Sequence, residues 1–457
     1  MSVQHSLPKL AGASSRLVRK QNRLLPKLRI ALFVLFMVAI YVDVSLRIST
    51  SFVLPNTFVL LVLMPILALM YYRRIYKYEA AFVGKIFLVL LLSVLLSPGL
   101  DFIDQKLLSL VQMMTAITGG VLLLKLLNDL QRRWVARVLL ALSVVLVAGT
   151  FLEVSGVLGT VSDSFRAVVF KHSGSSFNQF YESGERDLGL TGFTRPKFFT
   201  AEPSYLAIGF FAFINSWLIL AYSRKGLFVA CLGTLVMFGL TGSPVLVLSL
   251  AVSLMIVLYG EPGLTSLVPI CALACTVGLG LVYAQPEVFT NFLERVSGSY
   301  ENLSSSSTTS SENRRLVFPY ITLVDVIREA PLFGVGVGGK EVIERYSSLP
   351  VDPSTALGNN VLASFFVSFG LVGSFLFIKF TFDYWRRAKV GRIALLVVFI
   401  FALSQTMGGP ETIKFWGYVF LFVGVVKKSL VPDERTPKPT GNKRVPGYKL
   451  LRRGKRW

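Results

Sequence analysis

The chain has few of the charged residues that cover the surface of a soluble protein. Only 16% of its 457 residues are charged, 53% are hydrophobic, and the mean hydropathy is +0.63. In a soluble domain roughly a quarter of the residues are charged. The composition therefore excludes an ordinary soluble domain and predicts an integral membrane protein.

Histidine and cysteine are also scarce. The two histidines are His5, near the N-terminus, and His172, in a polar segment. No cluster of His, Cys and acidic residues is available to build a zinc site. The three cysteines, Cys231, Cys271 and Cys275, lie inside apolar runs, where small packing residues are expected rather than a metal or redox site. We therefore expect no metal and no cofactor.

The net charge of +22 comes largely from the two tails. Residues 1–29 hold seven Lys and Arg and no acid, and residues 427–457 hold eleven against Asp433 and Glu434. Positive charge next to a membrane span keeps a segment in the cytoplasm. Basic residues do not alternate with aromatics as in single-strand binders, so we expect no nucleic-acid partner.

Long apolar runs dominate the rest of the chain. A helix needs about 20 mostly apolar residues to cross a bilayer, and these runs are too long and too uniformly apolar for barrel strands. The sequence predicts an all-α, polytopic integral membrane protein with about 12 transmembrane helices and two long outer loops. The expected spans are 29–49, 53–71, 80–98, 106–127, 138–157, 203–222, 226–241, 243–259, 264–283, 358–380, 393–409 and 412–427.

The short basic connectors support this count. With a cytoplasmic N-terminus, each of them falls on the cytoplasmic side, which predicts that both termini are cytoplasmic. The least certain division is at Thr241 to Pro244, which suits either a tight turn or a kink. The connectors are Arg73–Arg74–Lys77, Arg132–Arg133–Arg137, Arg224–Lys225 and Arg386–Arg387–Lys389–Arg392.

This topology divides the chain into alternating tails, spans and loops, with no room for a soluble domain. Any chemistry is expected on the outer face or in a cavity beneath it. The parts are a basic cytoplasmic tail (1–28), helices one to five (29–157), a first long loop (158–202), helices six to nine (203–283), a second long loop (284–357), helices ten to twelve (358–427) and a basic cytoplasmic tail (428–457).

The first loop ends in a segment that can bind an anion. Pro203 suits the first turn of a helix and places Glu202 at about the cap. The positive end of that helix, beside Arg195 and Lys197, suits a diphosphate. Glu202 can then accept a proton from an attacking hydroxyl. A capped helix flanked by interfacial cations explains the same residues and remains an alternative.

The second loop carries Arg314 and Arg315, followed by a predicted interfacial helix that begins near Pro319. The string from Gly334 to Gly339 follows no strand, which excludes a nucleotide-binding loop and favours a flexible connection. The expected helix has Tyr320, Leu323, Val324 and Ile327 on one face and Thr322, Asp325 and Arg328 on the other.

Several ionisable residues lie near the outer ends of the expected spans. Charges at this depth are costly and usually face a cavity, but anchoring at the interface explains them equally well. No role is assigned to them from sequence. They are Asp43, Asp101, Asp104, Glu153, Glu411 and Lys414.

Both loops resemble those of Wzy-type bacterial O-antigen polymerases, within the O-antigen polymerase/ligase superfamily. Arg195-Pro-Lys-Phe-Phe-Thr-Ala-Glu202-Pro-Ser204 is similar to their Arg…Phe-x-Glu-Pro-Ser segment. Arg314-Arg315 with the following Ala-Pro-Leu-Phe-Gly-Val-Gly string resembles the second loop of the superfamily, as does the stretch after Asn359-Asn360. Ligases of this superfamily usually carry a histidine before the asparagine where this chain has Asn359, so polymerase is the better fit.

The resemblance implies a glycosyltransferase of the bacterial inner membrane. Its donor and acceptor would be undecaprenyl-diphosphate-linked glycans, without metal or nucleotide donor, and a chain-length regulator would be a partner. Arg195 and Arg314 or Arg315 would hold the diphosphate, and Glu202 would act as base or orient Arg195. Lys197, Ser204, Asn359 and Asn360 would bind substrate.

Three other classes of protein remain open. A ligase shares the superfamily, and a flippase of lipid-linked oligosaccharide shares the expected topology. Transporters, however, tend to have internal repeats and broken helices at the midplane, whereas this chain gathers its polar residues in two unequal outer loops. A structural membrane protein would need no catalytic motif at all.

Overall fold

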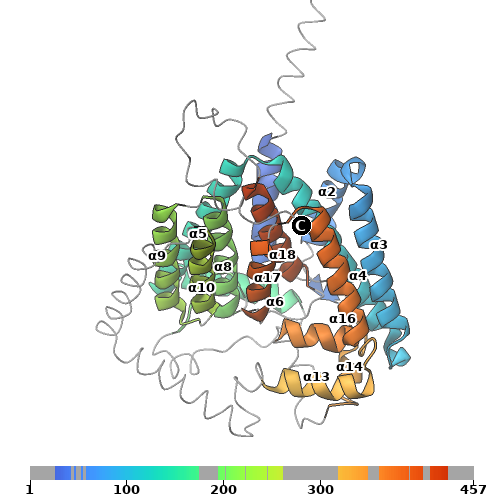
Figure 1. The fold of residues 1–457 in the computed structure, drawn as a ribbon. Coiled ribbons are helices and arrows are strands. Elements are labelled where there is room, and N and C mark those ends of the chain that lie inside the picture. The colour runs from blue at the N-terminus through green and yellow to red at the C-terminus, as the bar shows by residue number, and fades with distance from the viewer. Residues whose placement is uncertain are drawn as a thin grey trace, which may run out of the picture.

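The computed structural model describes twelve parts of the chain, which form a bundle of helices (Figure 1). Apart from one pair of two-residue strands, the elements in these parts are helical. The described residues are 26–42, 46–47, 53–54, 58–173, 194–200, 202–221, 223–243, 245–260, 317–347, 360–390, 392–404 and 412–430.

Along the chain, a first helix is followed by two short strands and then by the other helices. Residues 26–42 form the first helix. The strands β1 (Leu46–Arg47) and β2 (Val53–Leu54) pair antiparallel. The remaining elements are η1 (Val59–Leu63), α2 (Met64–Tyr71), η2 (Tyr72–Arg74), α3 (Lys77–Leu95), η3 (Leu100–Phe102), α4 (Ile103–Asp129), α5 (Arg132–Val154), α6 (Gly159–Ser173), α8 (Pro203–Leu220), α9 (Arg224–Thr241), α10 (Val245–Gly260), α13 (Phe318–Glu329), α14 (Lys340–Ile343), α16 (Val361–Arg387), α17 (Arg392–Ser404) and α18 (Ile413–Ser429).

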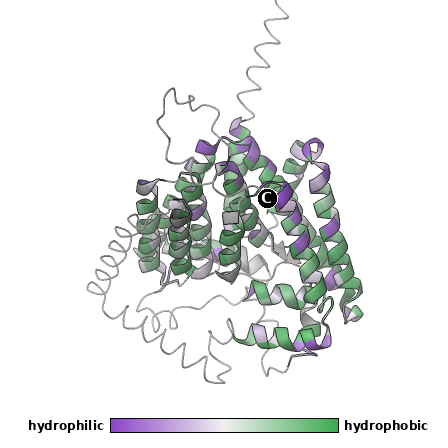
Figure 2. Ribbon diagram, in the orientation of Figure 1, coloured by the Kyte–Doolittle hydropathy of each residue, from purple (hydrophilic) through white to green (hydrophobic). Residues whose placement is uncertain are grey.

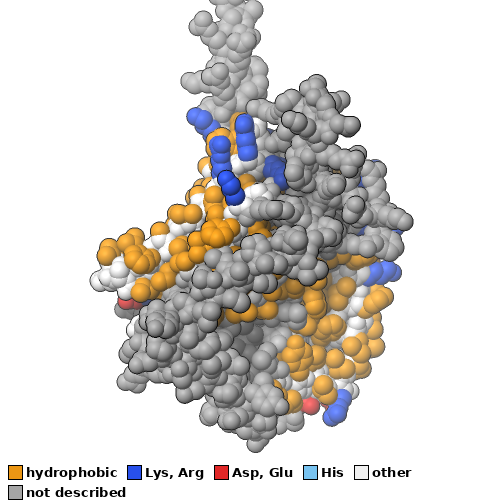
Figure 3. All heavy atoms as spheres, turned by 60° about the vertical axis from the view of Figure 1, so that its left-hand side comes forward, with side chains coloured by type: hydrophobic (Ala, Val, Ile, Leu, Met, Phe, Trp, Pro, Cys, Tyr) orange, Lys and Arg blue, Asp and Glu red, His pale blue; other side chains and the backbone are white. Residues whose placement is uncertain are grey.

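The apolar character of these helices fits a polytopic membrane protein. Five helices in the described parts are long and apolar enough to cross a bilayer, and α9 and α10 are shorter apolar helices. Hydrophobic residues run along the middle of the bundle, with hydrophilic ones towards the helix ends (Figure 2). Figure 3 shows hydrophobic side chains over the middle of this face, with Lys and Arg grouped at its upper end and a few more at its right-hand and lower edges. The fold class predicted from sequence is therefore confirmed.

Helices cover most of the expected spans that fall within the described residues, but β1 and β2 lie within the expected spans 29–49 and 53–71. The expected span 264–283 lies outside them, so the number of spans remains a prediction. The division at Thr241 to Pro244 is a turn between two helices, because α9 ends at Thr241 with Gly242 in the left-handed region and α10 begins at Val245. Helix α6 falls inside the first polar loop, where the apolar pattern predicted no helix.

Helix α18 forms the centre of the bundle and packs against α4 and α8. Its side chains from Ile413 to Val426 are buried. The approach to α4 is close: an added Cβ at Gly120 would lie 2.0 Å from the Phe420 ring, and one at Gly424 would lie 2.5 Å from Leu127. Glycine at these two positions lets the two helices pack tightly without a clash.

One end of the bundle, called here the basic end, is where α3 and α5 begin and α16 ends. Four arginines lie at this end, two just before α3 and two at the end of α16: Arg73, Arg74, Arg386 and Arg387. One buried ion pair and one cluster of three charged residues join segments of the chain at this end. Glu79 Oε2 of α3 lies 2.6 Å from Lys125 Nζ of α4, and both side chains are almost fully buried. Asp129 Oδ2 pairs with Arg29 at 3.0 Å and with Arg74 at 2.9 Å.

The opposite end, called here the loop end, is where α8 and α18 begin and where α13 and α14 lie (Figure 1). Helix α16 is kinked here at Gly370, which has φ 61° and ψ −167°. The kink forms main-chain pairs with the glycine-rich segment: Val335 N donates to Val367 O, and Leu371 N donates to Pro331 O. The kink and this segment therefore hold each other in place.

The prediction that Gly334 to Gly339 form a flexible connection is wrong. Gly334 and Gly336 are buried, and an added Cβ at Gly336 would lie 2.5 Å from Ser97 Oγ of the α3 end. Gly336 N also donates to Ser368 O. The glycines allow the backbone to pass between α16 and α3, which is close approach rather than freedom to move.

Helix α13 lies where the sequence predicts it. Tyr320 and Val324, on the predicted apolar face, are exposed, while Thr322, on the opposite face, is fully buried. Helix α13 packs its Thr322 and Val326 side against the protein. Its exposed side is apolar, as suits a helix at a membrane surface.

Candidate functional site

The first-loop motif forms a sharp turn that the end of α5 holds in place. Phe198 and Phe199 have positive φ values of 35° and 61°. Glu153, near the end of α5, accepts a hydrogen bond from Phe198 N, and Tyr41 Oη donates to Phe198 O at 2.8 Å. Positive φ at two bulky residues is strained and persists only where surrounding contacts impose it. The hydrogen bonds of Phe198 with Glu153 and Tyr41 impose these φ values here.

Helix α6 completes the support of this turn. Arg166 NH1 lies 3.1 Å from Glu153 Oε1 and donates to Ser162 Oγ at 3.0 Å. Ser162 Oγ in turn accepts from Phe199 N at 3.1 Å. Arg166 also pairs with the exposed carboxylate of Asp163. A buried carboxylate, an arginine and a serine therefore link α5, α6 and the turn that follows Arg195 and Lys197.

Glu202 occupies the N-cap of α8, and Pro203 is its first residue, as the sequence predicts. The Glu202 side chain makes no capping bond to the helix backbone. Instead, Glu202 Oε2 accepts a hydrogen bond from Ser204 Oγ at 3.0 Å. Thr200 Oγ1 donates to the Glu202 carbonyl at 2.9 Å, which fixes the backbone at this point. The carboxylate is half-buried beside the positive end of α8.

A buried cation lies close to the start of α8. Lys414, in the first turn of α18, is 1% exposed, and its Nζ lies 4.6 Å from the centre of the Tyr205 ring. Tyr205 follows Glu202 by three residues and is itself buried. Lys414 was noted in the sequence as an ionisable residue near the outer end of a span, without a role. The structure brings it next to the first-loop motif.

The structure places four predicted residues together and leaves three unplaced. Arg195, Lys197, Glu202 and Ser204 lie on one segment at the loop end, with the first two half-buried. Asn360 is the N-cap of α16, where its Oδ1 accepts from Ala363 N at 2.9 Å. Arg314, Arg315 and Asn359 lie outside the described residues.

The sequence did not identify the residues that hold the first-loop turn in place. Glu153 stood out only as an acid near the end of an apolar span, and Arg166 lay in a segment expected to be loop. The spacing of Ser162, Asp163 and Arg166 was the available signal, because residues three and four apart meet on one helix face.

Within the described residues no group of three His, Cys, Asp or Glu could hold a metal ion.

Comparison with protein families adds an independent observation. Residues 208–378 match the family model described as O-Antigen ligase (Wzy_C). The match supports the O-antigen polymerase/ligase superfamily. It covers less than half of the chain, from the first turns of α8 through the second loop to the middle of α16. No curated protein and no solved structure matches the chain.

The family match and the first-loop motif cover different parts of the chain. The matched residues include Arg314, Arg315, Asn359 and Asn360 but begin after Ser204. The match indicates a membrane enzyme of the O-antigen ligase or polymerase type. It does not distinguish between these two reactions.

Proposed function

We propose that the protein is a membrane glycosyltransferase that polymerises undecaprenyl-diphosphate-linked oligosaccharide repeat units into O-antigen or exopolysaccharide. The loop end would face the periplasm of the bacterial inner membrane, with both termini in the cytoplasm. The observation that carries the proposal is the fixed segment from Arg195 to Ser204, which presents two cations and a carboxylate at the start of α8. The superfamily match supports the same class of reaction.

In the proposed reaction, a hydroxyl of the acceptor glycan attacks the anomeric carbon of the donor glycan. The bond from that carbon to the diphosphate oxygen breaks, and the lipid diphosphate leaves. Arg195, Lys197 and Arg314 or Arg315 stabilise the charge that develops on the leaving group. Glu202 takes the hydroxyl proton as general base, or orients Arg195. Ser204 and the asparagine pair Asn359-Asn360 contact the sugars.

The position before Asn360 favours polymerase over ligase. Ligases of the superfamily usually carry histidine there, and this chain has Asn359. O-antigen ligase is nevertheless the second candidate, because the matched family model is described by that name. The two functions differ in the acceptor, which is a lipid-linked glycan for a polymerase and a lipopolysaccharide core for a ligase.

The test uses the purified full-length protein with lipid-diphosphate-linked repeat units, EDTA and no nucleotide. We expect a ladder of lengthening glycans, read on a gel. The Arg195→Ala variant should slow the reaction at least about tenfold, because a hydrogen bond to a charged group contributes roughly 1.5–3 kcal/mol. Arg133→Ala, at the basic end, is the matched control and should keep the ladder.

Each other outcome has a distinct meaning. Transfer of glycan only when a lipopolysaccharide core is added would make the protein a ligase. Movement of the lipid between vesicle leaflets with no ladder would make it a transporter. A normal ladder from both Arg195→Ala and Arg315→Ala, at normal protein levels, would contradict the proposed mechanism.

A further inference from the structure

Two lysines lie on the outer surface of helices that are long and apolar enough to cross a bilayer. Lys85 is on α3 and Lys379 is on α16, and both side chains are exposed. These two helices pack side by side on one outer side of the bundle (Figure 1). A charge within a span is costly and usually faces a protein interior or a water-filled cavity. Two exposed cations on these helices therefore need an anion or water beside them.

Both lysines lie at about the same depth. Lys85 is eight residues past Lys77, where α3 begins, and Lys379 is eight residues before Arg387, where α16 ends. At a rise of 1.5 Å per residue, each lies about 12 Å along its helix from the basic end. Lys85 Nζ lies 5.1 Å from the centre of the Phe380 ring of α16, which agrees with this level. Because the hydrocarbon core is about 30 Å thick, both lysines belong to the leaflet at the basic end.

Neither lysine has an acidic partner among the described residues. The ion pairs found there join other side chains. Asp383 follows Lys379 by four residues on α16 and is half-buried, but the two form no ion pair. Lys85 remains exposed although its ammonium lies over the Phe380 ring. An anion from outside the chain can therefore reach both lysines.

The surface between Lys85 and the basic end has room for a lipid headgroup. Side chains on a helix lean towards its N-terminus, and α3 begins at the basic end, so Lys85 leans towards that end. Ala81, one turn closer to it, is exposed and small, which leaves space beside the lysine. Arg386 and Arg387 are exposed at the same end of α16. Positive charge therefore continues from the basic end into the span.

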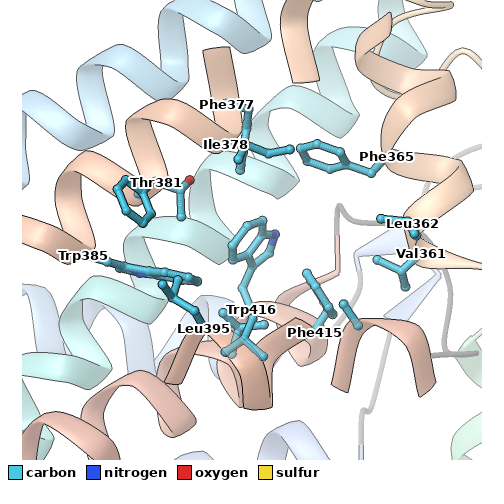
Figure 4. Close-up of a pocket in the computed structure, with 14 residues that line it drawn as sticks. Val361, Leu362, Phe365, Phe377, Ile378, Thr381, Trp385, Leu395, Phe415 and Trp416 are labelled. Atoms are coloured by element: carbon cyan, nitrogen blue, oxygen red, sulfur yellow. The ribbon is translucent and has the colours of Figure 1, made fainter. Parts of the chain in front are cut away.

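Another side of α16 carries no such charge. There, an apolar pocket of about 210 Å³ lies between α16, α17 and α18. Figure 4 shows Thr381 and Trp385 of α16 and Trp416 of α18 around this pocket, and none of the residues that line it is charged. An anion is therefore attracted to the outer surface shared by α3 and α16, and not to this pocket.

We propose that an anionic phospholipid binds at the seam between α3 and α16, in the leaflet at the basic end. Its phosphate lies between Lys85 and Lys379. Its acyl chains follow exposed apolar side chains deeper in the same helices, Leu88 of α3 and Phe375 of α16, which are 52% and 64% exposed. The site lies towards the end of the bundle opposite Glu202, so it is separate from the segment to which we assign catalysis.

An anionic phospholipid explains both the charge and the position of the seam. A zwitterionic phospholipid carries an ammonium group beside its phosphate and is attracted less strongly. A second copy of this chain fits poorly, because a two-fold contact brings the same patch of both subunits together. Such a contact would place Lys85 and Lys379 close to the same lysines of the other copy, and like charges repel most strongly in an apolar surrounding.

The test uses the full-length protein in neutral detergent, titrated with phosphatidylglycerol or with phosphatidylcholine of the same acyl chains. Native mass spectrometry measures the bound lipid. We expect phosphatidylglycerol to bind at least about tenfold more tightly, because each of two basic residues favours an anionic lipid about fivefold. It should also raise the thermal unfolding temperature more than phosphatidylcholine does. Glycerol 3-phosphate, which has the headgroup charge without the chains, should not compete.

Matched variants separate the seam from general effects. Lys85→Gln and Lys379→Gln should each weaken phosphatidylglycerol about fivefold, the double variant should lose the preference, and Lys85→Arg should keep it. Lys225→Gln, at an exposed lysine of α9 at the basic end, should behave as the wild type. Ala81→Phe fills the space beside Lys85 and should weaken binding, whereas Ala141→Phe, at an exposed position of α5, should not.

Three results would overturn the lipid site. The first is equal binding of the two lipids to the wild type. The second is an equal loss in Lys225→Gln and Lys85→Gln, which would show that net charge alone retains the lipid. The third is a wild-type dimer that Lys85→Gln with Lys379→Gln separates, which would make the seam a contact between two copies. None of these results would change the glycan ladder, which tests the proposed function separately.

Discussion

The Glu153 carboxylate accepts a hydrogen bond from the backbone amide of Phe198 and pairs with Arg166 at 3.1 Å. One side chain near the end of α5 thereby fixes the strained turn that follows Arg195 and Lys197. The geometry of the candidate site depends on this residue, although it lies 42 positions or more from the motif in the sequence. Glu153 is a positioning residue in our proposal, since nothing places it against substrate.

Removal of the Glu153 carboxylate should therefore loosen the first-loop motif. We expect Glu153→Ala to lower polymerisation at least about tenfold, because a hydrogen bond to a charged group contributes roughly 1.5–3 kcal/mol. Glu153→Gln keeps an acceptor for Phe198 N and should retain more activity. The measurement is the glycan ladder, normalised to the amount of folded protein.

Asp163→Asn is the control for Glu153. It removes the exposed partner of the same arginine, and exposed ion pairs contribute little, about 0–1 kcal/mol. Equal loss of activity in Asp163→Asn and Glu153→Ala would show that the charge of Arg166, and not the fixed turn, is what matters.

Substitutions at Glu202 should separate its two possible roles. Glu202→Gln keeps an acceptor for Ser204 Oγ but cannot take a proton. If Glu202 is the general base, the rate should fall about 100-fold or more, and the initial rate of ladder formation would measure it. Ser204→Ala leaves the carboxylate in place and should cost less. A Glu202→Gln variant that is no slower than Ser204→Ala would assign Glu202 to the orientation of Arg195.

Gly370→Ala should damage the loop end. An added Cβ would lie 2.5 Å from Gly334 N, and φ at this position is +61°, where alanine is strained. We expect a large fall in folded protein, or loss of activity if the kink straightens, measured by fluorescence-detected size exclusion and the glycan ladder. Gly84→Ala on α3 is the control, because nothing lies within 4 Å of its added Cβ. It should be neutral or slightly stabilising, and equal damage from both would contradict the close-approach argument.

The Glu79–Lys125 pair should be important for stability. Removal of one partner of a buried ion pair typically costs about 3–5 kcal/mol, so Glu79→Ala should sharply lower the thermal unfolding temperature in detergent. Replacement of both residues, by Glu79→Leu with Lys125→Met, should regain most of that loss. Arg74→Ala breaks an exposed contact to Asp129 and should cost less than about 1 kcal/mol. The buried-pair argument fails if Arg74→Ala and Glu79→Ala destabilise equally.

Local pattern predicted that the apolar runs form helices, and it located the starts of two of them. The residue pair Glu202-Pro203 marked the start of α8 because a proline at the first helical position leaves no backbone donor unsatisfied. Helix α13 began close to Pro319 for the same reason. Helix α6 was missed, because its side chains mix polar and apolar types and part of its polar face is used in contacts with Glu153 and Phe199.

The glycine-rich segment was predicted wrongly, and the surroundings of the two faces of α13 were not predicted. Periodicity tells which residues share a helix side, not which side meets protein and which meets lipid. Thr322 lies opposite Tyr320 and Val324, as predicted, but only the structure shows that the Thr322 side is the buried one. Glycine permits either flexibility or close packing, and only the neighbouring backbone of α16 shows that packing applies here.

The sequence by itself determined the membrane class and the helical fold, because these depend on local composition and spacing, and it predicted that the segment from Arg195 to Ser204 binds an anion. The tertiary structure decided which distant residues complete the site. Glu153, Arg166 and Lys414 come from three other helices. The apolar pocket lined by Trp385 and Trp416 exists only where α16, α17 and α18 meet. Such contacts follow from the packing of whole helices, which no short stretch of sequence encodes.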